Sequence, residues 1–245
     1  MKNVNVLPVT VEGEILAKLR HRFGHKAQIQ EGDIRLETVL NSASVKKRFN
    51  MNGDGQSTRP LESFIGRNDL VVTYALKVAI NKVDTTGNAT NGNSIDYTYP
   101  DLGVFTDPAV APNVSEASAL ESVFGGNMTI KANTTEILNQ MQLRRFRIAP
   151  ETQLSATTQA SLMEDGFVPF VQPYIFSGRD TNILEFEPAV GADTALIGGA
   201  TGTQNVLVFH FKSFVVRNGA QPLTVEEADR VAQVMKNYTS SGALL

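Results

Sequence analysis

Residues 206–216, with the sequence VLVFHFKSFVV, place the tightest limits on the fold of this chain. In an extended strand the odd-numbered apolar side chains share one face, and they are Leu207, Phe209, Phe211 and Val215. The opposite face carries His210 and Lys212, flanked by apolar side chains. This period-two pattern predicts a β-strand with one face in a hydrophobic core and the other partly in water. A strand of this size spans roughly 35 Å, which is long.

A second segment with a similar pattern, residues 70–80, lies far upstream. Its even-numbered apolar side chains are predicted to share one face, and they are Leu70, Val72, Tyr74, Leu76, Val78 and Ile80. Thr73 and Lys77 fall on the other face. Two long amphipathic strands so distant in the chain must pair or pack through long-range contacts. We therefore expect a β-sandwich or barrel.

Shorter segments complete a mainly β chain. Further strands are predicted at residues 95–99, 128–132, 143–148, 167–176 and 182–187, and residues 33–40 form either a strand or a helix. Pro169 and Pro173 make 167–176 an edge strand or a bent one, because proline cannot donate to a sheet ladder. Helices are predicted at residues 10–23, 115–124 and 225–238. About seven to nine strands with short helices between them indicate an antiparallel jelly-roll β-sandwich.

Charge is unevenly distributed along the chain. Residues 1–60 hold ten of the 22 Lys and Arg and six of the 25 Asp and Glu, so this segment is basic and the remainder is acidic. This asymmetry predicts an N-terminal basic arm, 1–60, on a jelly-roll body, 61–245, that includes the C-terminal helix 225–238. The helix predicted at 10–23 has an apolar stripe formed by Ile15, Leu16, Leu19 and Phe23.

No pattern in the sequence predicts catalysis. Cysteine is absent, which excludes disulfides and thiolate metal sites. Residues 50–55 imitate a calcium loop, but Leu61 occupies the position of the required glutamate, so a turn is favoured. His21 and His25 lack a neighbouring acidic ligand, and His210 is interpreted as a structural histidine in mid-strand. We predict a protein that is not an enzyme and that binds no metal and no cofactor.

The chain shows neither a membrane-spanning apolar run nor a pattern typical of a signal peptide. The more informative signal comes from basic residues. Two clusters in the arm are candidates to face nucleic acid or a membrane: Arg20, Arg22, His25 and Lys26, and then Lys46, Lys47 and Arg48. An ordinary solvated helix face is an equally weighted alternative. A third cluster is predicted to contact carboxylates of a neighbouring subunit or strand, and it comprises Arg144, Arg145 and Arg147.

Four segments follow one another between residues 97 and 186: YTYPDLGVF, ESVFGGNMTIKANTTEIL, RRFRIAPETQ and DGFVPFVQPYIFSGRDTNILEF. Their order resembles jelly-roll capsid (coat) proteins of tailless, often membrane-containing, bacteriophages. The resemblance covers less than half of the chain and includes no catalytic signature. Because 245 residues are few for a coat protein with two jelly rolls, a single-barrel coat, a minor capsid protein and a spike base all stay open.

The resemblance implies a structural virion protein, made in the host cytoplasm, that self-assembles into an icosahedral shell. Its partners would be copies of itself, as trimers or a larger capsid lattice, and other virion proteins. The basic arm would face packaged nucleic acid or an internal membrane. A carbohydrate- or surface-binding β-sandwich module, such as a spike or receptor-binding protein, is the alternative. Zero Trp and five Tyr disfavour a sugar platform, and a single β-region histidine, His210, disfavours a cupin-like hydrolase.

Overall fold

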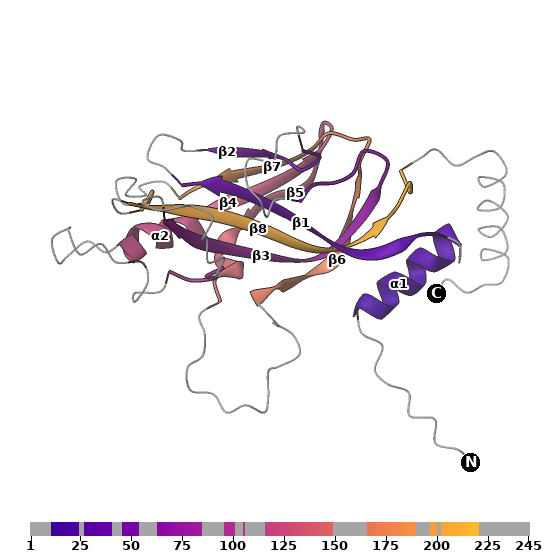
Figure 1. Ribbon diagram of the computed structural model, residues 1–245, viewed down its shortest axis with the longest axis horizontal. Coiled ribbons are helices and arrows are strands. Elements are labelled where there is room, and N and C mark those ends of the chain that lie inside the picture. Colours follow the sequence, from indigo (N-terminus) through magenta and orange to yellow (C-terminus); the bar gives the residue numbers. More distant parts are fainter. Residues whose placement is uncertain are drawn as a thin grey trace, which may run out of the picture.

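The computed structural model describes residues 11–24, 27–40, 46–53, 63–84, 96–100, 105, 116–148, 166–189, 197–199 and 202–220. These residues form two antiparallel four-stranded sheets and two α-helices (Figure 1). The prediction of a mainly β chain is therefore confirmed. The predicted C-terminal helix at 225–238 lies outside the described residues.

Each sheet mixes strands from both halves of the chain. Sheet A has the order β1 (Ile29–Val39), β8 (Thr203–Val216), β3 (Leu70–Asp84) and β6 (Val168–Ser177). Sheet B has the order β2 (Lys47–Asn50), β7 (Asn182–Glu187), β4 (Asn127–Ala132) and β5 (Thr135–Gln142). Among these strands, only β4 and β5 are both consecutive in the chain and paired with each other.

Strand β8 lies inside sheet A, and its two neighbours pair with it over long stretches. Along one edge β8 pairs with β1, from Val206 opposite Val39 to Val216 opposite Ile29. Along its other edge it pairs with β3. The predicted strand at 206–216 is thus confirmed, and so is the expectation that it meets the distant strand at 70–80. Figure 1 shows the three strands running side by side.

The prediction that residues 70–80 present one continuous apolar face is wrong. The register of β3 against both neighbours shifts between Thr73 and Ala75, so Tyr74 is an extra residue that inverts the alternation. Before this bulge, Val72 lies on the outer face of sheet A, whereas after it Leu76 lies in the core between the sheets. Sequence alternation alone cannot reveal this inversion, because both halves of the strand are apolar at even positions.

The core between the sheets is built around aromatic residues of β8. The ring of Phe209 meets Phe49 of β2 edge-on at 5.4 Å and lies 6.2 Å from Phe186 of β7. Phe209 and Phe211 are completely buried. Thr73 and Ser213 point into the same interior and bond to each other through their hydroxyl groups at 2.9 Å, which satisfies both buried hydroxyl groups.

Two short strands escaped prediction, and two segments predicted as strands, 143–148 and 95–99, do not form named strands in the described residues. β5 has mostly exposed polar side chains and β2 has only four residues, so neither gives a strong periodic signal. The strand predicted at 143–148 is instead a 3₁₀-helix, η1 (Leu143–Phe146), followed by Arg147 in an extended conformation. Leu143 and Phe146 are both buried, and their spacing of three suits a 3₁₀ turn better than a strand.

Most other local predictions agree with the structure. The segment predicted at 33–40 as either a strand or a helix belongs to strand β1, and the proline-containing segment forms β6 at the edge of sheet A. The strand predicted at 95–99 is the exception, because its described residues, 96–99, hold a single bridge, Tyr97 to Ile80, and no named strand. The helix α2 (Glu116–Phe124) is present where predicted, and it buries Leu120 and Val123.

Helix α1 (Val11–Phe23) is also present where predicted, within the basic segment 1–60. From Ile29 onwards, however, this segment is integrated in the body, because β1 belongs to sheet A and β2 to sheet B. The boundary between arm and body at residue 60 stays a prediction. The arrangement in Figure 1 places α1 beside one end of sheet A.

Removing the aromatic centre of the core tests this packing. We expect Phe209→Ala to lower the free energy of unfolding by about 3–5 kcal/mol, because it deletes a buried ring between the sheets. The matched control Val171→Ala changes a side chain that is 94 % exposed and is expected to alter it by less than about 0.5 kcal/mol. Urea unfolding of both variants measures the difference, and similar values for the two would contradict this account of the core.

Candidate functional site

The outer face of sheet A is polar in its middle and apolar towards both ends. Near one end, Val72, Phe214 and Val216 form an apolar platform, and Val206 and Val208 form another towards the opposite end. Between them, β8 presents His210 and Lys212, as the sequence predicts, and β3 adds Lys77. The antiparallel registers place these side chains next to one another.

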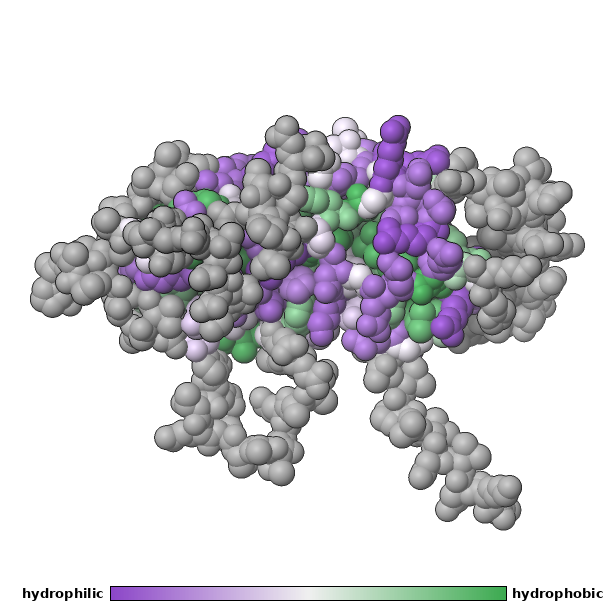
Figure 2. Space-filling model, viewed as in Figure 1, coloured by the Kyte–Doolittle hydropathy of each residue, from purple (hydrophilic) through white to green (hydrophobic). Residues whose placement is uncertain are grey.

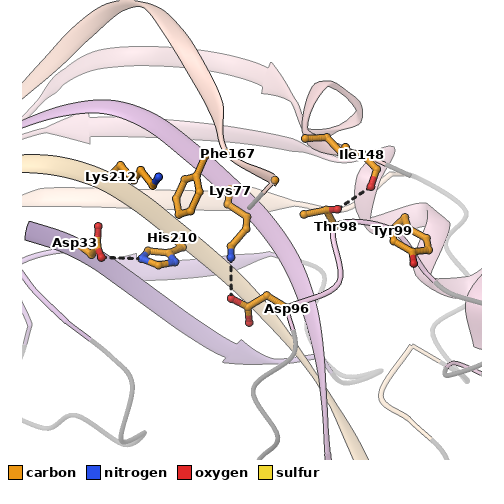
Figure 3. A pocket seen from close by; sticks show the side chains of 10 residues that line it. Asp33, Lys77, Asp96, Thr98, Tyr99, Ile148, Phe167, His210 and Lys212 are labelled. Carbon is orange, nitrogen blue, oxygen red and sulfur yellow. Dashed lines mark hydrogen bonds and ion pairs between the residues drawn. The ribbon is translucent and has the colours of Figure 1, made fainter. Parts of the chain in front are cut away.

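The polar middle is the floor of a pocket of about 590 Å³. Its walls come from the segment 96–100, from Ile148 and from the residues just before β6. Among the described residues, those that line it are Asp33, Lys77, Asp96, Thr98, Tyr99, Ile148, Gly166, Phe167, His210 and Lys212. Figure 3 shows Lys212, Lys77 and His210 around the ring of Phe167, with Asp33 beside His210 and Asp96 beside Lys77.

An ion-pair network ties one wall of the pocket to the sheet. Arg35 of β1 donates two hydrogen bonds to the carboxylate of Asp96, at 2.7 and 2.9 Å, and its Nε donates to Glu37 at 2.7 Å. The ammonium of Lys77 approaches Asp96 at 3.3 Å. A bidentate arginine–carboxylate pair is directional and strong, so this network fixes the segment carrying Asp96 to β1 and β3.

The charges in this network shift each other's titration. Burial by itself would raise the pKa of Asp96, but the hydrogen bonds and positive charges of Arg35, and then Lys77, outweigh it and hold the pKa below its ordinary value. Burial likewise opposes the charge of Arg35, and the carboxylates of Asp96 and Glu37 overcome it and raise the arginine pKa. Both side chains are therefore ionised around neutral pH.

A second group of contacts surrounds Phe167. The ammonium groups of Lys212 and Lys77 lie 4.6 and 5.0 Å from the centre of its ring, and the imidazole of His210 meets the ring edge-on at 4.9 Å. His210 Nε2 lies 3.4 Å from an oxygen of Asp33. The hydrogen bond from His210, followed by the positive charges nearby, lowers the pKa of Asp33 despite its partial burial.

Helix α1 covers the apolar platform at the end of sheet A. The predicted stripe is confirmed as its packing face, because Ile15 and Leu19 are buried against Val72 and Phe214, and Leu16 and Phe23 are partly buried there. Tyr74 stacks on Phe214 at 5.4 Å. Burial, and then the carboxylate of Glu12 in the first turn of α1, raises the pKa of the Tyr74 hydroxyl group.

The structure does not bring the two predicted basic clusters of the arm together. Arg20 and Arg22 are exposed on α1, over sheet A, and the space-filling view shows mainly hydrophilic side chains in this region (Figure 2). His25 and Lys26 lie outside the described residues. Lys46, Lys47 and Arg48 lie in or next to β2 of sheet B, where Lys46 pairs with Glu185 at 3.3 Å.

The third basic cluster lies on η1 and just after it. Arg144, Arg145 and Arg147 are all exposed, as a role in subunit contact requires. Arg147, however, already binds a carboxylate of its own chain, since it forms several hydrogen bonds of 2.6–3.0 Å to Glu121 of α2. Contact of these arginines with another subunit stays a prediction.

The predicted turn at 50–55 is confirmed for the described part, residues 50–53. The side-chain oxygen of Asn50 accepts from the backbone of Asn52, whose own side chain bonds to Gly178 and Asn182.

Within the described ranges, no three histidine or acidic side chains converge as a metal site requires, and no helix is long and apolar enough to cross a membrane. The prediction that the protein binds no metal or cofactor stays a prediction.

Sequence reasoning identified His210 and Lys212 but not the pocket around them. Asp33, Arg35, Lys77 and Asp96 come from three separate segments, and no local spacing connects them. The one available signal was that charged side chains interrupt otherwise apolar strands at Lys77 and Lys212.

Comparison with protein-family models, with curated proteins and with solved structures found no match to this chain.

The Arg35–Asp96 pair makes stability depend on acid pH. The folded-state pKa of Asp96 is lowered, so the unfolded chain takes up the proton first, and this contribution to stability is lost as the pH falls below about 4. Near pH 7 we expect Asp96→Asn to cost about 3 kcal/mol, because Arg35 loses a buried partner.

The control is Asp33→Asn. The Asp33 side chain is 56 % exposed, so we expect loss of its charge to lower the free energy of unfolding by less than about 1 kcal/mol. Urea unfolding between pH 7 and pH 3 provides the measurement. The gap between the wild type and Asp96→Asn should narrow steadily below about pH 4. A gap that stays constant down to pH 3 would show that Asp96 is not held by charge.

Proposed function

We propose that this protein is a jelly-roll capsid subunit that assembles with copies of itself, with α1 towards the interior of the shell. The observation that carries the proposal is the strand order of the two sheets. Strands pair from the outside of the chain inwards: β1 with β8, β2 with β7, β3 with β6, and β4 with β5. A long hairpin rolled up in this way produces an eight-stranded jelly roll, an architecture common in viral capsid domains.

Fold analogy alone does not establish a function, so the surface must also support assembly. Strand β6 forms an edge of sheet A, and its pairing with β3 is interrupted between Pro169 and Tyr174. On this edge, Val171 is 94 % and Ile175 is 48 % exposed. Exposed apolar side chains on an incompletely paired edge favour coverage by another chain, since such edges otherwise promote uncontrolled association.

The docking of α1 favours nucleic acid over membrane as its interior partner. A helix that binds a bilayer inserts its apolar face among the lipids. In α1 that face is already buried against sheet A, through Ile15 and Leu19. The exposed face offers charged side chains, among them Lys18, Arg20 and Arg22, which neutralise phosphates without insertion.

The assembly proposal is tested on the β6 edge. We expect the wild type to form trimers or larger particles in sedimentation velocity at micromolar concentration. The double variant Val171→Glu/Ile175→Glu should shift the distribution towards monomers, because it places charges on the proposed contact. Asn139→Glu, on an exposed position of β5, is the matched control and should assemble as the wild type does. A monomeric wild type would refute the proposal.

The proposed role of α1 is tested through the salt dependence of DNA binding. Each lysine or arginine that contacts a phosphate of duplex DNA contributes about 0.9 to the slope of log affinity against log salt. Arg20→Gln/Arg22→Gln should therefore reduce the slope by about two and weaken binding at low salt. The control Arg144→Gln/Arg145→Gln removes equal charge from η1.

Equal losses in the two double variants would show that only net charge matters and that α1 is not the interface. The membrane alternative is tested in the same series with anionic phospholipid vesicles. If the wild type binds vesicles more tightly than DNA, and loses that binding in Arg20→Gln/Arg22→Gln, the proposal of nucleic acid as the partner is wrong.

A further inference from the structure

The pocket on the outer face of sheet A contains positive charge that its own carboxylates do not fully pair. Asp96 is committed to Arg35 and Lys77, as the short contacts above show. Among the described residues, no ion pair involves the ammonium of Lys212, which instead lies over the ring of Phe167. The positive charge of Lys212 acts on the carboxylate of Asp33, whose side chain is more than half exposed and hydrogen-bonded to His210.

His210 adds a second incompletely used group. Its Nε2 faces Asp33, while its Nδ1 is buried and has no hydrogen-bond partner among the described residues. The charged groups around this imidazole are Asp33, Arg35 and Glu37 from β1, Lys77 from β3, Lys212 from β8 and Asp96 from the segment 96–100. When the imidazole is protonated, four positive groups face three carboxylates.

We propose that this pocket binds a tetrahedral, doubly charged oxyanion, such as a phosphate group, with Lys212 as its principal contact and Lys77 and His210 beside it. Lys77, Lys212 and His210 all line this pocket, and all three contact the ring of Phe167. Three donor side chains in one pocket match the several oxygens of a phosphate better than the two of a carboxylate. The pocket, at about 590 Å³, also has room for an organic group attached to the anion.

The charge of the ligand explains why a dianion is favoured. Asp33 and Asp96 line the same pocket and reduce the attraction that the lysines exert on any anion. Attraction and repulsion both grow in proportion to the charge of the ligand, so where the positive groups prevail a dianion gains about twice the net attraction of a monoanion. The proposal does not depend on assembly or on DNA binding, because it concerns a small anion and the isolated chain.

Inorganic sulfate is the probe, because its charge is constant between pH 6 and pH 8, whereas that of phosphate is not. The chain has three histidines, so the NMR signal of the His210 imidazole can be assigned with one His210→Gln variant. Sulfate should shift this signal saturably. Acetate should bind at least tenfold more weakly.

Variants separate the proposed contacts from general charge effects. Lys212→Gln should weaken sulfate binding by about tenfold, as expected for the loss of one charged hydrogen-bond donor. Asp33→Asn should strengthen it several-fold, because it removes a competing carboxylate. Lys18→Gln, which removes the same charge from the exposed face of α1, should leave the affinity unchanged. Thermal unfolding of each variant, measured without sulfate, verifies that it is folded.

Three results would overturn the proposal. One is a His210 signal that sulfate does not shift in the wild type. Another is a folded Lys212→Gln variant that binds sulfate as tightly as the wild type. The third is acetate binding equal to or tighter than sulfate binding, which would point to a carboxylate ligand. None of these measurements changes if the protein fails to assemble, so the outcome is independent of the proposed function.

Discussion

The pairing of β8 with both β1 and β3 is the interaction on which the rest of the structure depends. These three strands come from the two ends and the first third of the chain, and no local contact holds them together. Their inner side chains, with Phe209 at the centre, supply the surface against which sheet B packs. Their outer side chains form both the platform for α1 and the floor of the charged pocket.

The single extra residue at Tyr74 divides that outer face into regions with different roles. Without the bulge, Leu70 and Val72 would point into the core and sheet A would offer α1 a less apolar surface. With it, their side chains meet Ile15 and Leu19 of the helix, while Leu76 and the residues after it remain in the core. One strand thus serves two apolar clusters on opposite faces of the same sheet. A register shift of one residue has this effect because side chains alternate with a period of two.

The same face therefore combines an anchored basic helix with a pocket that holds lysines and a histidine. An amphipathic helix alone would suit a membrane surface. In α1 the apolar stripe is buried against sheet A, so the helix is held in place and exposes its charged side chains. The Arg35–Asp96 pair keeps one wall of the pocket attached to the sheet. Lys77 and Lys212 contact Phe167, which belongs to another wall. The proposals for DNA binding and for anion binding both rest on this face of sheet A.

The sequence by itself determined the elements whose signal is local and periodic. The strand at 206–216, the helix at 10–23 with its stripe, and the helix at 115–124 were all predictable, because alternation and helical spacing reflect which side chains must be buried. The resemblance to capsid proteins and the uneven charge gave a functional hypothesis that stays a proposal.

Tertiary structure alone decided the rest, because it depends on which distant strands become neighbours. Nothing local indicates that Arg35 meets Asp96, that Lys212 approaches the ring of Phe167, or that the basic clusters of the segment 1–60 separate onto two sheets. The bulge at Tyr74 is likewise invisible in the sequence, since an apolar strand tolerates either alternation. The strand register, which the packing of both sheets fixes, decides which of the two alternations forms.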